Sequence, residues 1–309
     1  MNQRKKNIQL LYILGGLLAI TTVVILMSGD DDALDVPRNL FSYPSTESVD
    51  EVLIGEDTLN FNGNFWVVNN KYKADPQRVE VLFAIARQIQ VRRQASMVQQ
   101  DSLNTNLDTK GVSLALKSQG QTMKEYTVWG DPARGMTWLR EPGSNMPYLA
   151  EIPGYRSYLG GIFELDENSW RYPIVLDINW QNLQQVAVSY PGKEQSSFEV
   201  VYENGFYGVS GLEATDSTRL TDFLDNLSLL YVNDYLSSSE VAQYDSLFSQ
   251  QEAHIVVSDV GQNEYVVDIF EKVPGRDEIL IRIDSSRVGL VDYGKVRTLL
   301  KPRVFFRQQ

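Results

Sequence analysis

The chain has 309 residues, and its 28 Lys and Arg against 40 Asp and Glu give a formal net charge of −12. An acidic chain of this kind is repelled by nucleic acid and by anionic lipid surfaces, so neither is an expected partner. The chain has no cysteine, which excludes disulfides, thiol catalysis and cysteine-ligated metals. A hydrophobic content of 43% and an aromatic content of 11% favour a packed globular body.

The first element in chain order is an apolar run without a charged side chain, residues 8–27, from Ile8 to Met27. A helix needs about 20 apolar residues to span the hydrocarbon core of a bilayer. Arg4, Lys5 and Lys6 precede the run, and cations hold that flank in the cytoplasm. We therefore expect a single-pass bacterial inner-membrane protein with a cytoplasmic stub and anchor (1–29) and a periplasmic body. The alternative is a cleaved secretory signal, but no small-residue cleavage site follows the run.

Residues 30–48 are rich in acids, proline and hydroxyl side chains, which is typical of a tether. Alternating apolar patterns then predict strands at 49–54 and 59–68. The second pattern is interrupted by Asn62-Gly63, a strong hairpin signal because a type I′ turn needs positive φ at both central residues. At Asp75-Pro76 the apolar spacing changes to that of an amphipathic helix, with Asp75 as the predicted N-cap.

The same order of strand, hairpin and helix returns about 140 residues later. Phe198-Glu199-Val200-Val201 is similar to Phe65-Trp66-Val67-Val68, and Asp216 precedes a second helical pattern as Asp75 precedes the first. Further on, Asp245-Ser246-Leu247 repeats Asp101-Ser102-Leu103. This order predicts an α+β fold in which two tandem, duplicated units of mainly antiparallel sheet, 49–180 and 181–309, are each packed by an amphipathic helix.

Several short motifs connect the chain to a known family. They are Phe65-Trp66-Val67-Val68, Ala74-Asp75 with Arg78-Val79, Tyr126 to Gly130, Tyr148-Leu149, Trp170-Arg171 and Ile174 to Asp177. In these motifs the chain resembles the bacterial domain-of-unknown-function 4340 family over most of residues 45–309. The resemblance implies a membrane-anchored protein, encoded beside gliding-type ABC transport components, and it transfers no catalytic residue. The longer connection from Asn204 to Thr215 departs from that pattern in the second copy.

Residues for catalysis are scarce in the sequence. The single histidine, His254, has no His or Cys partner for zinc, and it is interpreted as a surface residue of a strand. Glu164, Asp166 and Glu167 form an acidic cluster that favours a solvated turn over the paired carboxylates of a glycan hydrolase. Asp75 and Asp216 are interpreted as structural helix caps. We therefore predict no catalytic, cofactor-binding or metal residue and no cofactor.

Aromatic and basic side chains are the candidates for an interaction surface. Tyr and Trp combine a large contact area with a polar tip, and arginines exposed on an acidic body offer a docking point for an acidic partner. Core packing and a solvated helix face are the competing interpretations of these residues. The candidate interaction surface consists of Arg87, Arg92, Arg93, Trp138, Tyr148, Tyr155 and Tyr158.

These patterns together favour a non-catalytic, membrane-anchored periplasmic accessory or scaffold subunit of a cell-envelope transport or gliding-type machine. Its expected partners are the inner membrane, through residues 8–27, and other envelope membrane proteins such as ABC transport components. The alternative is a periplasmic glycan- or peptide-binding module that uses a cleft between the two repeats. A carboxylate-dependent glycan hydrolase is the third interpretation.

The membrane topology can be tested directly. A periplasm-dependent reporter fused after Gln309 should be active, because the cations before Ile8 hold the N-terminus inside. Mass spectrometry of the mature protein should find residues 1–27 still attached. Recovery of a soluble chain that begins near Ser28 or Asp30 would show a cleaved signal instead.

Overall fold

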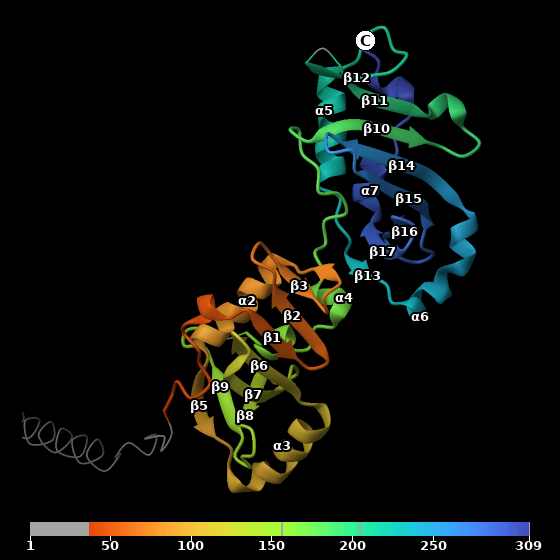
Figure 1. The fold of residues 1–309 in the computed structure, drawn as a ribbon. Coiled ribbons are helices and arrows are strands. Elements are labelled where there is room, and N and C mark those ends of the chain that lie inside the picture. Colours follow the sequence, from red (N-terminus) through yellow and green to blue (C-terminus); the bar gives the residue numbers. More distant parts are fainter. Residues whose placement is uncertain (1–36, 156, 204, 309) are drawn as a thin grey trace, which may run out of the picture. The chain divides into compact units, whose positions relative to one another are not determined.

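The computed structural model describes residues 37–155, 157–203 and 205–308. The protein is an α+β protein with two antiparallel sheets and few helices (Figure 1). The expected membrane anchor, Ile8 to Met27, lies outside the described residues. Within the described part of the chain, no helix is long and apolar enough to cross a bilayer.

The first sheet has nine strands in the order β4-β3-β2-β1-β6-β7-β8-β9-β5. Its strands all come from residues 51–151, and the helices α2 (Pro76–Gln88) and α3 (Met97–Lys110) lie between them in sequence. The strands are β1 (Glu51–Ile54), β2 (Asp57–Phe61), β3 (Trp66–Val68), β4 (Tyr72–Lys73), β5 (Gln90–Gln94), β6 (Val112–Ser118), β7 (Gln121–Asp131), β8 (Met136–Arg140) and β9 (Tyr148–Glu151).

The second sheet has eight strands in the order β12-β11-β10-β14-β15-β16-β17-β13. Its strands are β10 (Leu183–Ser189), β11 (Phe198–Glu203), β12 (Phe206–Val209), β13 (Asp234–Tyr235), β14 (Gln251–Asp259), β15 (Glu264–Lys272), β16 (Glu278–Ile283) and β17 (Arg287–Asp292). The helices that accompany it are α5 (Ser217–Ser228), α6 (Ser238–Val241), the 3-10 helix η4 (Ala242–Ser249) and α7 (Tyr293–Leu299), while the short α4 (Glu167–Trp170) precedes it.

The two sheets share one strand order when β4 is left aside. If the remaining strands of each sheet are numbered 1 to 8 in chain order, both sheets have the spatial order 3-2-1-5-6-7-8-4. This order makes β12 the counterpart of β3, and α5 the counterpart of α2. The sequence comparison that matched Phe198 to Phe65 was therefore wrong by one strand, because Phe65-Trp66 adjoins β3 whereas Phe198 begins β11. The true counterpart is Phe206-Tyr207, which also follows an Asn-Gly pair.

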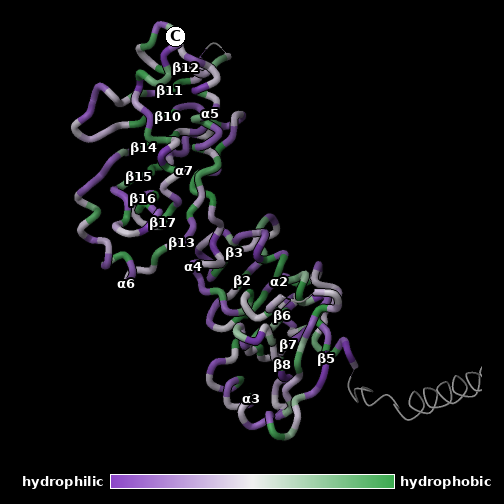
Figure 2. The backbone as a smooth tube through the Cα atoms, turned by 180° about the vertical axis from the view of Figure 1, so that it is seen from behind, coloured by the Kyte–Doolittle hydropathy of each residue, from purple (hydrophilic) through white to green (hydrophobic). Residues whose placement is uncertain are grey.

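Contacts divide the chain into two compact units, one of residues 82–163 together with the segment up to Val49, and one of residues 50–81 with 164–309. In the second unit, alternate side chains of the eight-stranded sheet enter a large core, among them Val186, Ile255 and Ile281. The helix α5 closes this core with residues at helical spacing, which the sequence predicted: Leu220, Phe223, Leu224 and Leu227. Figure 2 shows such hydrophobic segments, in green, interleaved with hydrophilic ones along the backbone.

The opposite sheet face also has a helical cover. In the second sheet, Leu247 of η4 packs in a smaller cluster with Phe270, Leu280 and Leu290. In the first sheet, Leu103 of α3 packs with Trp138 and Leu149 in a cluster at the equivalent strands. The segment between the fourth and fifth strands therefore covers the same region of each sheet, and an Asp-Ser-Leu sequence occurs in this segment in both halves of the chain.

The helix caps Asp75 and Asp216 occupy the positions that the sequence predicts. The Oδ1 atom of Asp216 accepts a hydrogen bond from the backbone N–H of Arg219 at 3.1 Å, and that of Asp75 accepts one from Gln77 at 2.9 Å. Each carboxylate also lies 3.4 to 3.5 Å from the Nε atom of the arginine three residues on, Arg219 or Arg78. The caps satisfy N–H groups that the first helical turn leaves without partners.

Substitution of the caps should separate a structural from a chemical role. Asp216→Ala should lower the free energy of unfolding by about 0.5–2 kcal/mol, because an N–H group of the first turn loses its acceptor. Asp216→Asn should restore most of the loss, since Asn caps nearly as well as Asp. Urea titration followed by circular dichroism measures both, with Asp75→Ala and Asp75→Asn as the second pair. An Asn variant no more stable than the Ala variant would contradict the capping role.

Candidate functional site

The structure removes two aromatic residues from the predicted interaction surface. Trp138 and Tyr148 are buried, at 1% and 6% exposure, so both belong to the core of the first sheet. Tyr155 is exposed, and the half-buried Tyr158 packs so closely on Gly130 that a Cβ atom there would collide with its hydroxyl. The run of tyrosines and tryptophan in the sequence does not form one exposed patch.

The three arginines of the predicted surface belong to different elements. Arg87 lies in the last turn of α2 and donates from Nη1 to Thr46 Oγ1 at 2.8 Å. Arg92 and Arg93 lie on the edge strand β5, not on a helix, and both are exposed. The Nε atom of Arg92 is 3.5 Å from Glu151 Oε2, and the guanidinium of Arg93 lies over the ring of Trp138. Arg92 and Arg93 remain available as an exposed basic pair.

The acidic cluster before Trp170 has structural partners. Asp166 caps α4 through the backbone N–H of Ser169, and Glu167 accepts a hydrogen bond from Asn69 Nδ2 at 2.6 Å. The same amide nitrogen donates to Asp57 Oδ1 at 2.7 Å, so one asparagine joins two carboxylates. Burial, as the largest cause, raises the pKa of Asp57, and Glu167 raises it further. The carboxylate that shares Asn69 with Glu167 is therefore Asp57 of β2, which lies far from Glu167 in the sequence.

A row of polar side chains crosses four neighbouring strands of the second sheet. Ser189 of β10 pairs with His254 of β14, which pairs with Asp268 of β15, which pairs with Arg282 of β16. Directly opposed residues of antiparallel strands project to the same face. Their sequence neighbours Ile255, Val267 and Ile281 point into the core on the other side, so the row lies on the face opposite α5.

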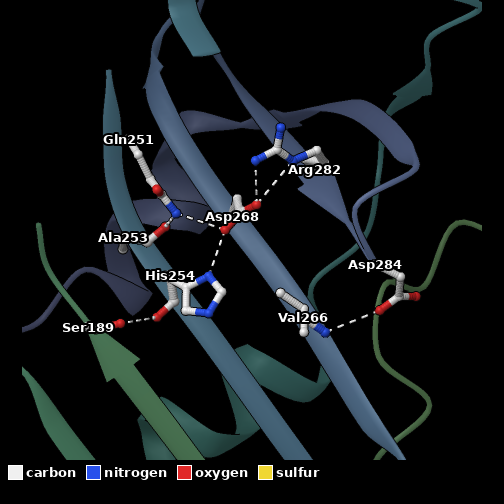
Figure 3. Close-up of polar contacts among 8 residues, drawn as sticks. All are labelled: Ser189, Gln251, Ala253, His254, Val266, Asp268, Arg282 and Asp284. Atoms are coloured by element: carbon white, nitrogen blue, oxygen red, sulfur yellow. Dashed lines mark hydrogen bonds and ion pairs between the residues drawn. The ribbon is translucent and has the colours of Figure 1, made fainter. Parts of the chain in front are cut away.

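Asp268 is the centre of this row (Figure 3). Its Oδ1 atom lies 2.7 Å from His254 Nδ1 and accepts from Gln251 Nε2 at 2.7 Å. Its Oδ2 atom accepts from Arg282 Nε at 3.0 Å and from Nη2 at 2.8 Å. Burial alone raises the pKa of Asp268, but the hydrogen bonds from His254 and Arg282 outweigh burial and lower that pKa below its ordinary value.

The row contains the residue types of a serine–histidine–carboxylate catalytic triad, but their geometry is not that of a triad. The hydrogen-bond network assigns the Nδ1 proton of His254 to the bond with Asp268, and the other ring nitrogen points away from Asp268. A nucleophilic serine must hydrogen-bond that second nitrogen. Ser189 Oγ instead donates to the backbone oxygen of His254 at 3.3 Å. The geometry therefore supports a fixed ion-pair network, in which Arg282 also stacks near the rings of Phe248 and Phe270.

Aromatic pairs, each with one exposed and one half-buried ring, occupy the equivalent hairpin of each sheet. On β2–β3, Phe61 pairs in register with Trp66, with ring centroids 5.6 Å apart. On β11–β12, Tyr202 pairs with Tyr207 at 4.9 Å. Each pair is flanked by an exposed phenylalanine, Phe65 or Phe206. These six residues are the aromatic hairpins.

The second aromatic hairpin is extended by Trp180, whose ring lies 5.3 Å from that of Tyr207. Its indole N–H donates to Asp225 Oδ1 at 2.9 Å, which fixes the ring although the residue is 45% exposed. Phe206 is 78% exposed. Large aromatic side chains exposed together are typical of contact surfaces. The sequence signal that could have found them is an Asn-Gly pair flanked by aromatic residues in each half of the chain, Asn62-Gly63 and Asn204-Gly205.

Comparison with protein-family models, curated proteins and solved structures finds no match. The resemblance to the domain-of-unknown-function 4340 family therefore stays a prediction from the motifs.

The network at Asp268 predicts a defined pH dependence of stability. Asp268→Asn should lower the free energy of unfolding at pH 7 by about 1–3 kcal/mol, because charge-assisted hydrogen bonds are lost. A carboxyl whose pKa is lowered by folding contributes its full stabilisation above its unfolded pKa of about 3.9, and this stabilisation is lost as the pH falls from there through the lower folded pKa. The difference between wild type and variant should therefore shrink as the pH falls below about 5.

Urea unfolding at a series of pH values measures this difference. Ser189→Ala is the matched control, since its exposed hydroxyl makes only the long bond to the His254 backbone, and its effect should stay within about 0.5 kcal/mol. A difference between wild type and Asp268→Asn that is constant with pH would show that the carboxylate charge contributes nothing to stability.

Proposed function

We propose that the protein is a non-catalytic accessory or scaffold subunit, held at the inner membrane by residues 8–27, that binds other envelope proteins. The observation that carries this proposal is an aromatic pair with one exposed ring at the same hairpin of both sheets, the exposed Phe61 with Trp66 and the exposed Tyr202 with Tyr207. The setting, a transport or gliding-type machine, comes from the family resemblance alone. We further propose that the shared strand order reflects duplication of one α+β unit.

Aromatic hairpins suit binding to protein because their rings remove a large apolar area from water while each tyrosine and tryptophan keeps a polar group for hydrogen bonding. A tightly packed aromatic residue at the centre of an interface can contribute about 2 kcal/mol or more to binding. The net charge of −12 disfavours nucleic acid and anionic membrane surfaces as occupants of the same hairpins. A protein partner is therefore the occupant that the chemistry favours.

A photo-crosslinking amino acid placed at Phe65 or Phe206 tests this function in native membranes. We expect a discrete adduct with another membrane protein at both positions, because both side chains are exposed beside an aromatic pair. Val304 is the matched control, since it is an apolar residue of comparable exposure at 62% outside the aromatic hairpins. Tyr202→Ser with Phe206→Ser should weaken copurification of that partner by about tenfold or more.

Two outcomes would contradict the proposal. One is an adduct yield at Val304 equal to the yields at Phe65 and Phe206. The other is a protein that elutes without any partner after mild detergent extraction. Asp57→Asn distinguishes the hydrolase alternative, because Asn keeps the shape of the side chain next to Asn69 but cannot transfer a proton. A folded Asp57→Asn protein that keeps its partner and loses cellular function would favour the hydrolase.

A further inference from the structure

Arg171 has an unusual environment for a charged residue. It follows α4, is 8% exposed, and its guanidinium lies between two tyrosine rings. The central carbon of the guanidinium is 3.9 Å from the ring centroid of Tyr72 and 3.8 Å from that of Tyr235. Stacking of this kind stabilises a cation on both faces and leaves only the edge of the guanidinium free to form hydrogen bonds.

The hydrogen-bonding edge of Arg171 is only partly satisfied. Its Nη1 atom donates to Asn168 Oδ1 at 3.0 Å, whereas its buried Nη2 atom has no hydrogen-bond partner among the described residues. Within the same part of the chain, Arg171 forms no ion pair with a carboxylate. The nearby Glu167 is engaged by Asn69. Arginine stays protonated in proteins, and a buried cation with an unused donor is costly unless an anion completes it.

A cavity of about 500 Å³ opens at this guanidinium. Arg171, Tyr72 and Tyr235 line it, and all of its lining residues belong to the compact unit of residues 50–81 with 164–309. Its charged lining consists of four cations, Lys71, Lys73, Arg171 and Arg287, and two carboxylates, Asp177 and Asp284, which leaves two positive charges in excess. This local excess is notable because the whole chain carries −12.

Both carboxylates of the lining already have a cation. Asp177 lies 3.5 Å from Lys73, and Asp284 lies 2.5 Å from Arg287. Among the described residues this leaves Lys71 and Arg171 as the lining cations without a carboxylate partner. Lys71 is exposed and reaches the cavity from the turn before β4. The two cations without a carboxylate partner are therefore the exposed Lys71 at the rim of the cavity and the buried Arg171 in its interior.

We propose that this cavity binds a small molecule carrying a carboxylate or phosphate group, which Arg171 and Lys71 hold while the tyrosine rings contact the rest of the ligand. Planar guanidinium groups hydrogen-bond both kinds of anion through two parallel N–H groups. The cavity volume lies within the range of about 300–1,000 Å³ that small-molecule sites occupy. Tyr172 and Tyr265 also line the cavity and provide ring surface for an aromatic or sugar portion.

Calorimetric titration of the full chain in detergent tests the site with three probes of similar size, phenyl phosphate, phenylacetate and benzyl alcohol. We expect saturable binding of at least one of the two anions at millimolar concentration and none of the neutral alcohol. Added salt should weaken the binding, because opposite charges attract less when screened. Binding of phenyl phosphate alone assigns a phosphate ligand, and binding of phenylacetate alone assigns a carboxylate.

Variants locate the binding in the cavity. Lys71→Gln should raise the Kd about three- to tenfold, and Arg171→Gln by about tenfold or more, because each removes a charged donor to the anion. Lys110→Gln is the control, since Lys110 is an exposed lysine at the end of α3, outside the cavity lining. If Arg171→Gln does not fold, the exposed Lys71 decides the test.

The site is overturned if neither anion binds saturably, if benzyl alcohol binds as tightly as the anions, or if Lys71→Gln leaves the Kd unchanged. These outcomes are independent of the scaffold function, because the titration needs no protein partner and the variants lie outside the aromatic hairpins.

Discussion

The structure of both units depends on the alternation of side chains along antiparallel strands. Because successive residues point to opposite faces, one strand can serve two environments at once. In β15, Val267 and Ile269 enter the main core while Asp268, between them, holds the polar row on the other face. A one-residue slip of this strand would place the Asp268 carboxylate in the core and expose both apolar neighbours. The ion pairs and the core therefore enforce the same register.

The local features of this fold could be predicted from the sequence. Asp75 and Asp216 cap their helices, and the apolar spacing after each Asp identifies the buried residues of α2 and α5, because capping and helical periodicity depend on neighbours in the chain. The correspondence of Phe198 with Phe65 failed for the opposite reason. Short alternating strands look alike in sequence, and only the pairing order tells the second strand of a sheet from the third.

The candidate sites depended on contacts between distant residues. His254 and Asp268 are 14 residues apart, and Tyr72, Arg171 and Tyr235 come from elements spread over more than half of the chain. Sequence spacing gives no signal for such neighbours. Trp138 illustrates the complementary error, because an aromatic residue near prolines and glycines can be buried as readily as exposed. The aromatic hairpins did leave a signal in the sequence, since an Asn-Gly pair flanked by aromatic residues occurs in each half of the chain.

The two proposed binding surfaces differ in how they relate to the shared topology. The aromatic hairpins occur in both sheets at the same strands, so they use a property of the common fold. The Arg171 cavity uses Tyr72 from β4, the strand that has no counterpart in the second sheet. The two-residue strand β4 therefore contributes to the Arg171 cavity, which occurs once, and not to the aromatic hairpins, which occur in both sheets.

The strand order also determines when each sheet can be completed as the chain is synthesised. Among the described strands, the fourth strand of each sheet pairs only with the eighth, β5 with β9 and β13 with β17, so its strand pairing must wait for the last strand to arrive. Pairings between strands so far apart in sequence form slowly, because a long loop must close before any contact stabilises it. Until Tyr148 or Arg287 is available, β5 and β13 have no partner strand, and each sheet stays incomplete at that edge.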